Sequence, residues 1–134
     1  MSGEASQIDT FNRLTADRAV DGDTSGNRHT SLTHTATQGP TAWWKVVLPS
    51  RSYIDNIQIY NREDCCGARI DGVTVYVDDE LVGTVTYEGG KRLYSFNDLS
   101  IIGQEVTVKG GSDFVSLGEV EVYGVLGKSW GSIV

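Results

Sequence analysis

The most regular feature of the sequence is a two-residue alternation of apolar and polar positions in four short runs. These runs lie at residues 57–60, 73–77, 106–109 and 119–122, and each has one apolar face. Turns rich in glycine and aspartate separate them. Helical periodicity is nearly absent. The pattern predicts an all-β domain whose short antiparallel strands form a sandwich or a barrel.

The two ends of the chain have a different character. The first forty residues have few apolar positions and contain a polar loop between Asp21 and Ser31. Such a long polar loop in a compact domain usually carries function or is braced by a metal ion. We expect one domain over residues 1–124, because no repeat or linker divides the chain. Residues 125–134 are expected to form a tail that frays or packs on the domain or on a neighbouring chain.

Composition narrows the class of partner. The chain of 134 residues has 11 basic and 18 acidic residues, and this net charge of -7 argues against nucleic acid or an anionic membrane. Three Trp, six Tyr and three Phe are typical of a folded core, and no stretch is apolar enough to insert into a membrane. A neutral ligand or a metal ion is expected instead. The first seven residues lack the features of a secretory signal, which suggests a removed leader or a larger carrier protein.

Catalysis finds little support in the sequence. Glu119 and Glu121 lie on one face of a strand, at a separation near that of paired glycosidase carboxylates. Alternating glutamates more often mark a solvated strand face, with a metal ligand as the next alternative. Zinc would need more regularly spaced ligands than two His and two Cys supply. We therefore expect no enzyme.

The most distinctive segment connects two of the predicted strands. It places Arg62 and Arg69 on one loop with Asp64 between them. Two guanidinium groups held by a carboxylate form a fixed set of donors that suits several hydroxyl oxygens. Cys65 and Cys66 are neighbours, and adjacent Cα atoms are closer than in most disulfides. Adjacency alone therefore favours free thiols.

This segment resembles the signature of the F-type lectins, the fucolectin family. The family pattern is a His, a longer interval, then Arg-x-Asp and a second Arg or Lys, and this chain supplies His34, Arg62, Asp64 and Arg69. The contiguous cysteines stand in the family's place. His29 is a lesser candidate for the histidine, because the interval from His34 to Arg62 is one residue longer than usual. Similar segments cover essentially the whole chain, at residues 19–22, 43–46 and 116–122.

The resemblance implies an eight-stranded β-jelly-roll sandwich of the galactose-binding type that binds terminal α-L-fucose. It implies that His34, Arg62 and Arg69 bond the ring oxygen and hydroxyls of the sugar, and that Asp64 orients the arginines. It also implies a disulfide between Cys65 and Cys66 in apolar contact with the sugar. Fucose is 6-deoxygalactose, with a methyl group where galactose has a hydroxyl, so its site needs an apolar patch beside the donors.

A structural cation, Ca²⁺, is a further implication of the resemblance. Hard oxygen ligands drawn from both ends of the chain are the kind that Ca²⁺ takes. The matching ligands are the side chains of Asp21, Asp23, Ser31 and Glu119 and the carbonyl of Arg18. Other members pair cysteines near this cation, where this chain has Leu32 and Gly118, so its stability is expected to depend more on the metal.

As a lectin, the chain would be extracellular or exposed on a particle surface and would recognise fucosylated glycans. Useful avidity would come from a homo-oligomer such as a trimer, or from a multivalent carrier protein. The alternative is a discoidin-like adhesion domain that binds protein or lipid. Such a domain would have no need of Arg62 or Arg69.

Overall fold

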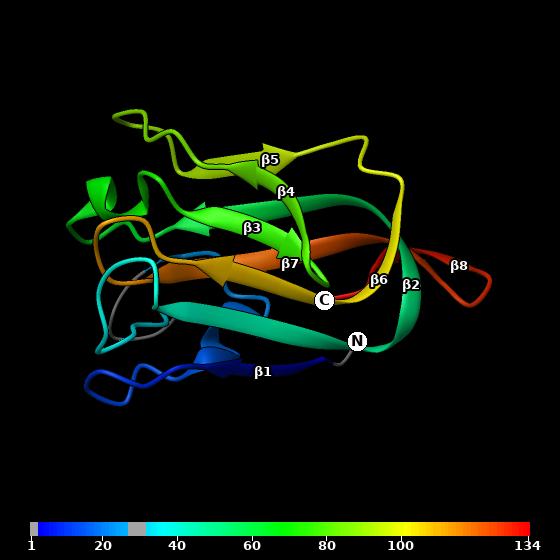
Figure 1. Cartoon of the computed structure of the whole chain (residues 1–134), viewed down its shortest axis with the longest axis horizontal. Helices are drawn as coiled ribbons and strands as arrows, with labels where there is room; N and C mark the ends of the chain where they lie inside the picture. The colour runs from blue at the N-terminus through cyan, green and yellow to red at the C-terminus, as the bar shows by residue number, and fades with distance from the viewer. Residues whose placement is uncertain (1–2, 27–31) are drawn as a thin grey trace.

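The structure, a computed structural model, describes residues 3–26 and 32–134, which contain eight antiparallel strands and two short 3-10 helices (Figure 1). The strands are β1 (Glu4–Gln7), β2 (Trp43–Asn61), β3 (Thr74–Val77), β4 (Glu80–Thr84), β5 (Leu93–Phe96), β6 (Ile101–Lys109), β7 (Leu117–Leu126) and β8 (Ser129–Ser132). The helices are η1 (Ala16–Ala19) and η2 (Gly67–Ile70). The predicted all-β class is confirmed. Among the described residues, no helix is long and apolar enough to cross a membrane.

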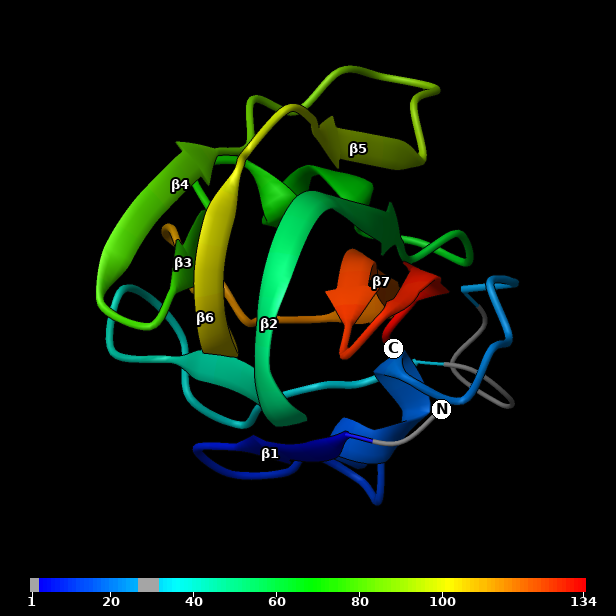
Figure 2. The same cartoon turned by 90° about the vertical axis from the view of Figure 1, so that its right-hand side faces the viewer.

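The long strand β2 joins the two layers of the sandwich. Its first half pairs with β1 and β6, whereas its second half pairs with β5 and β7. Between the halves, the register with β6 shifts from Val47 to Ser52, a stretch that contains Pro49. Figure 2 looks onto this bend and shows β2 curving from one layer to the other. β3 and β4 extend the first layer beyond β6, and β8 extends the second beyond β7.

The core lies between the layers and is formed by the apolar faces of the predicted runs. Its buried side chains include Ile57, Ile59, Val75, Val77, Val106, Val108, Val120 and Val122. Trp44 is also fully buried, and its indole N–H donates to the carbonyl of Ala16 at 2.9 Å. This bond fixes η1 against the sheet.

Loops at one end of the sandwich carry the candidate site. The segment around His34, the helix η2 and the loop between β6 and β7 gather at the left of Figure 1, opposite the bend of β2. Backbone N–H groups of Thr33 and Thr35 donate to the carbonyls of Leu117 and Val115, at 2.9 and 3.0 Å. The histidine-bearing segment is thereby anchored to the start of β7.

Residues 125–134 lie on the sheet itself. β7 continues to Leu126, a turn follows at Gly127 with a φ of 64°, and β8 returns antiparallel to β7. Beyond β8, Ile133 is 2% exposed and belongs to the core. This end of the chain is therefore packed against the domain.

Candidate functional site

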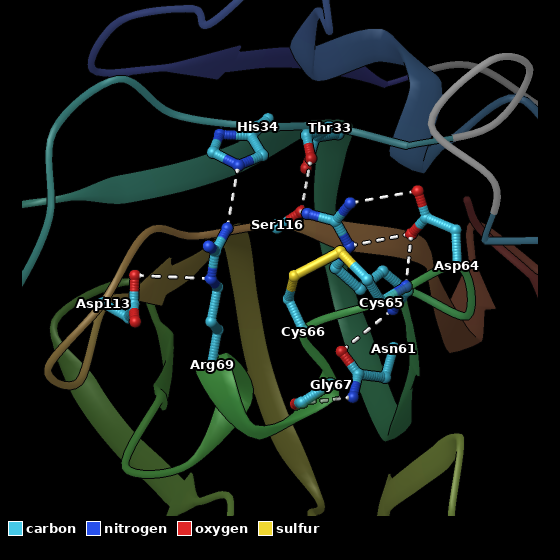
Figure 3. Close-up of a disulfide and its surroundings, with 11 residues drawn as sticks. Thr33, His34, Asn61, Asp64, Cys65, Cys66, Gly67, Arg69, Asp113 and Ser116 are labelled. Atoms are coloured by element: carbon cyan, nitrogen blue, oxygen red, sulfur yellow. Dashed lines mark hydrogen bonds and ion pairs between the residues drawn. A yellow bond between two sulfur atoms is a disulfide. The ribbon is translucent and has the colours of Figure 1, made fainter.

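Arg62 is held rigidly at the end of β2. Its Nε and one terminal nitrogen donate to the two carboxylate oxygens of Asp64, at 2.9 and 3.1 Å. The other terminal nitrogen donates to Ser116 Oγ at 3.2 Å, and this hydroxyl in turn donates to the carbonyl of Thr33 at 3.0 Å (Figure 3). Partial burial raises the pKa of Asp64, but the hydrogen bonds and charge of Arg62 outweigh it and the pKa is lowered. The carboxylate thus stays ionised and keeps the guanidinium in place.

His34 is buried, and one ring nitrogen is committed to the backbone. Its Nδ1 lies 2.6 Å from the carbonyl of Thr35. Because a carbonyl can only accept, Nδ1 carries the proton and Nε2 is left as an acceptor. Burial lowers the pKa of His34, and the positive charges of Arg62 and Arg69 lower it further. The imidazole is therefore neutral at neutral pH.

Arg69 reaches the site from η2. One terminal nitrogen lies 3.5 Å from Nε2 of His34, and Nε lies 3.7 Å from Oδ1 of Asp113. The guanidinium carbon also stands over the ring of Phe114, 5.3 Å from its centroid. The expectation that Asp64 orients both arginines is correct for Arg62 only. Arg69 is oriented instead by Asp113 and Phe114.

Cys65 and Cys66 lie between Asp64 and Arg69 in the sequence and form a disulfide (Figure 3). The backbone N–H of Cys65 donates to Asp64 Oδ1 at 3.0 Å, and Cys66 takes a left-handed conformation with a φ of 61°. The free thiols favoured by adjacency alone are therefore wrong, and the bridge implied by the family resemblance is confirmed. Both residues are exposed, so their sulfur atoms present an apolar surface to a ligand.

These residues line one open pocket of about 300 Å³. His34, Arg62, Arg69 and both cysteines contribute to it, together with Phe11, Leu14 and Phe114, which sequence reasoning missed. Phe11 and Phe114 flank the imidazole of His34 with centroid distances of 4.9 Å each. The pocket thus combines fixed donors, one acceptor and apolar walls.

A second group of expected residues, the candidate cation ligands, includes Glu119 in β7. Glu119 is 2% exposed, so the solvated strand face expected for it is wrong. Its Oε2 accepts the N–H of Gly22 at 2.7 Å, and its buried Oε1 has no hydrogen-bond partner in the described part of the chain. Burial raises the pKa of Glu119 to about 8, and the charges of Asp21 and Glu121 act in the same direction against the bond from Gly22.

Among the other expected cation ligands, Asp21 lines the same surface hollow as Glu119. Arg18 lies in η1. Asp21 accepts the N–H of Asp23, and Asp23 accepts that of Ser25, both at 3.0 Å. Ser31 and the lesser histidine candidate His29 lie outside the described residues. Within the described ranges, no three His, Cys, Asp or Glu side chains come close enough to hold a metal ion.

Comparisons with known proteins agree with this fold. A family model described as a NedA-like, galactose-binding domain matches residues 18–110. Fucolectin-5 of Anguilla japonica is 35% identical over 122 residues, covering 81% of this chain and 63% of the relative. The crystal structure of an f-lectin (fucolectin) from Morone saxatilis (striped bass) serum superposes with a TM-score of 0.83 at 25% identity, covering 92% of this chain and 46% of that one. A Streptococcus pneumoniae fucose binding module, SpX-3, superposes with a TM-score of 0.80 at 26% identity, covering 94% and 96%.

The bent sandwich with a ligand-sized pocket among its end loops defines a galactose-binding-like domain, and these similarities confirm the expected jelly-roll fold. The chain belongs to the fucolectin family, the F-type lectins. It spans 63% of the length of fucolectin-5 and 68% of fucolectin-6 from the same species.

Proposed function

We propose that this chain is a lectin domain that binds terminal α-L-fucose on glycans and catalyses no reaction. The observation that carries the proposal is one pocket in which the Cys65–Cys66 disulfide stands beside His34, Arg62 and Arg69. The names of similar proteins support it, since they are called fucolectins and a fucose binding module.

The polar side chains of the pocket offer both kinds of hydrogen bond to a sugar. Arg62 and Arg69 only donate, so they suit the lone pairs of the ring oxygen and the hydroxyls. Nε2 of His34 is the acceptor for a hydroxyl hydrogen, because Nδ1 is bound to the backbone. Since Asp64 and Ser116 hold Arg62 before any sugar arrives, little side-chain entropy is lost on binding.

The apolar walls account for a preference for fucose over galactose. Cys65, Cys66 and Phe11 surround the polar side chains without supplying a side-chain hydrogen-bond partner. A methyl group against these walls removes apolar surface from water. A hydroxyl in the same place would lose its water and gain no partner.

Isothermal titration calorimetry with methyl α-L-fucoside and methyl α-L-galactoside tests this preference, because the two sugars differ only at C6. Leaving a buried hydroxyl unpaired costs about 1–3 kcal/mol, so the fucoside should bind roughly fivefold to over a hundredfold more tightly. Equal affinities would contradict the role of the apolar walls. Binding of lipid vesicles without binding of either sugar would favour the discoidin-like alternative.

We further propose that Ca²⁺ is held between the loop at residues 18–23 and β7. The supporting observation is the buried, unpartnered Oε1 of Glu119 beside Asp21, in a hollow of about 240 Å³ that Glu121 also lines. A bound Ca²⁺ would supply positive charge to these carboxylates. The ligands would be Asp21, Asp23, Glu119 and the carbonyl of Arg18.

The proposed lectin acts outside the cell or on an exposed surface, in line with the serum source of the similar bass protein. One shallow pocket holds a single sugar weakly, so we propose that several domains act together, in a homo-oligomer such as a trimer or on a carrier. Light scattering combined with red-cell agglutination tests this. A strict monomer that agglutinates cells would require a second sugar site on the same chain.

A further inference from the structure

A row of apolar side chains crosses the end of the molecule where β2 bends. Tyr53 of β2 pairs with Ile102 of β6 on one side and with Val125 of β7 on the other. Val125 in turn pairs with Trp130 of β8. Directly opposed residues of antiparallel strands point to the same face of a sheet, so these four side chains form one row, which we call the Trp130 row. Figure 2 looks onto this end, where β6, β2 and β7 lie side by side.

The Trp130 row lies on the outer face of the sheet. Trp130 is 61% exposed and Ile102 is 62% exposed, whereas Tyr53 and Val125 are half-buried. The hydroxyl of Tyr53 lies 3.2 Å from Oγ of Ser100, and the strands hold the backbone, so the row is ordered before any partner arrives. Single exposed apolar residues are ordinary, but a contiguous row of them marks an interaction site.

The strand segments that carry the row contain no charged side chain. The 11 basic and 18 acidic residues of the chain all lie outside residues 52–54, 99–103, 123–127 and 129–133. In a protein of net charge -7, repulsion between carboxylates opposes most contacts between two copies. Two copies can meet at this face without that repulsion. A lipid surface is a poorer match, because membrane-binding faces usually carry several cations beside their apolar residues.

The two ends of the row are flanked by opposite charges. Lys128 lies in the turn two residues before Trp130. At the other end, Asp98 lies four residues before Ile102. Lys128 and Asp98 are exposed, and neither has an ion-pair partner among the described residues. A two-fold axis through the middle of the row sets the Trp130 end of one copy against the Ile102 end of the other, so each lysine faces an aspartate and the surface is complementary to itself.

The end of the molecule is large enough for a weak, reversible dimer. Weak specific interfaces bury about 1,000 Å² in total, or about 500 Å² from each copy. This share is less than a tenth of the 6440 Å² surface of the chain. Tryptophan is among the side chains that contribute most to such contacts, and Trp130 offers one that is already exposed.

We propose that the Trp130 row is a self-association face, at which two copies of this chain pack row against row about a two-fold axis. The row and the sugar pocket lie at opposite ends of the molecule, so the two pockets of the dimer would point away from each other (Figure 1). Such a dimer would join two glycan-bearing surfaces rather than bind one surface twice. This consequence rests on the proposed fucose site, whereas the dimer itself does not.

Analytical ultracentrifugation over a range of protein concentrations tests the dimer. The wild type should pass from monomer to dimer with a dissociation constant below about 1 mM. Trp130→Ser and Ile102→Ser should each raise this constant by about tenfold or more. Leu81→Ser is the matched control, because Leu81 is 53% exposed on β4, at the opposite edge of the sheet, and it should leave the constant unchanged. All three side chains are exposed, so each variant should keep the wild-type melting temperature.

An exchange of charges tests the two-fold arrangement. Lys128→Glu and Asp98→Lys should each associate more weakly than the wild type, because each sets like charges against each other at both ends of the row. An equal mixture of the two variants should associate about threefold or more tightly than either variant alone. The reason is that the mixed dimer restores an opposite pair at each end.

The proposal is overturned if the wild type stays monomeric up to about 1 mM, or if it forms a trimer, which a single two-fold face cannot build. A dimer that survives both Trp130→Ser and Ile102→Ser would place the contact elsewhere. A mixture of the charge variants that associates no more tightly than its parts would refute the two-fold arrangement. Binding of neutral lipid vesicles by a monomeric wild type would assign the row to a membrane instead.

Aggregation of fucose-coated beads tests the bridging role. The wild type should aggregate the beads, whereas Trp130→Ser should not, although calorimetry should find the same affinity of both for methyl α-L-fucoside. Aggregation by a monomeric Trp130→Ser would refute bridging through the row. A wild type that dimerises but fails to bind the fucoside would refute the fucose site and leave the self-association face intact.

Discussion

Replacing Arg69 by alanine is a clean test of the fucose site, because this arginine contributes little to the fold. Its side chain is 33% exposed, and its ion pair with the equally exposed Asp113 spans 3.7 Å. Such a pair stabilises a protein by less than about 1 kcal/mol. Arg62 is less suitable, since it is buried and its loss would remove a hydrogen-bond partner from both Asp64 and Ser116.

The expected loss of affinity follows from the bonds that Arg69 would make to the sugar. A hydrogen bond from a charged group contributes about 1.5–3 kcal/mol. Losing one such bond raises the Kd for methyl α-L-fucoside by roughly tenfold to over a hundredfold. Arg69→Lys keeps the charge but loses the planar fork, so its Kd should lie between those of the wild type and the alanine variant.

Calorimetry measures these affinities, and a thermal scan shows whether the fold is intact. Arg51→Ala is the matched control, because it also removes an arginine that faces an aspartate, Asp78, at 3.5 Å. Arg51 belongs to the bend of β2, which lies at the opposite end of the molecule from the sugar pocket (Figure 1). The control should bind like the wild type. A Kd for Arg69→Ala within about threefold of the wild-type value, with the fold intact, would refute the assignment of Arg69 to the sugar site.

Three further perturbations have defined outcomes. The fold lowers the pKa of His34 below the roughly 6.5 of an unfolded imidazole, so its contribution to stability is complete above about pH 6.5 and is lost as the pH falls through the folded pKa. Fucose affinity measured against pH should fall over the same acid range, because protonation removes the Nε2 acceptor, and a constant affinity down to about pH 4.5 would contradict this role. Mild reductant should weaken fucose binding with little change in melting temperature, because the Cys65–Cys66 bridge closes the shortest loop; thiol labelling that finds two free thiols in the untreated protein would contradict the bridge. EDTA should lower the melting temperature by several degrees, since Ca²⁺ at about a hundredfold excess over its Kd contributes about 2.7 kcal/mol, and Glu119→Gln should reproduce part of that loss. An unchanged wild-type melting curve in EDTA and in added Ca²⁺ would remove the cation from the account.

The proposed cation loop and the sugar pocket are connected through the backbone. The carbonyl of Gly26 accepts the N–H of Glu63 at 2.8 Å, and Arg92 donates to the carbonyl of Thr24 at 2.5 Å. Gly22, in the same loop, donates to Glu119. Loosening this loop would therefore disturb the residues next to Arg62, so EDTA should also lower fucose affinity.

The strands could be predicted from the sequence because their signal is local. Val75, Val77, Val106 and Val108 alternate with more polar neighbours and are buried, as a half-buried strand requires. The bend of β2 is a property of the whole sandwich, in which one strand pairs with β1 and β6 and then with β5 and β7. Alternation within short windows carries no information about it.

For the candidate site too, some residues could be predicted from the sequence and others could not. Arg62, Asp64 and the cysteines lie within a few residues on one loop, so their order in the chain already places them together. Phe11, Asp113 and Phe114 come from loops near the two ends of the chain and have no periodic pattern. Only the folded chain brings their side chains to His34 and Arg69.

The burial of Glu119 could not be predicted either, because it depends on a segment that is distant in the sequence. Along β7 it occupies a position that alternates with Val120, which is the pattern of a solvated face. The loop at residues 20–22 covers that position in the folded chain, and its Gly22 N–H binds the carboxylate. Burial by a segment so distant in the sequence leaves no trace in the local pattern.

The most direct measurement of the central claim is a crystal structure of this chain with methyl α-L-fucoside. The account predicts the sugar in the pocket lined by His34, Arg62 and Arg69, with its C6 methyl group against the Cys65–Cys66 disulfide. A sugar bound elsewhere, or one in this pocket with its methyl group turned to solvent, would contradict the account.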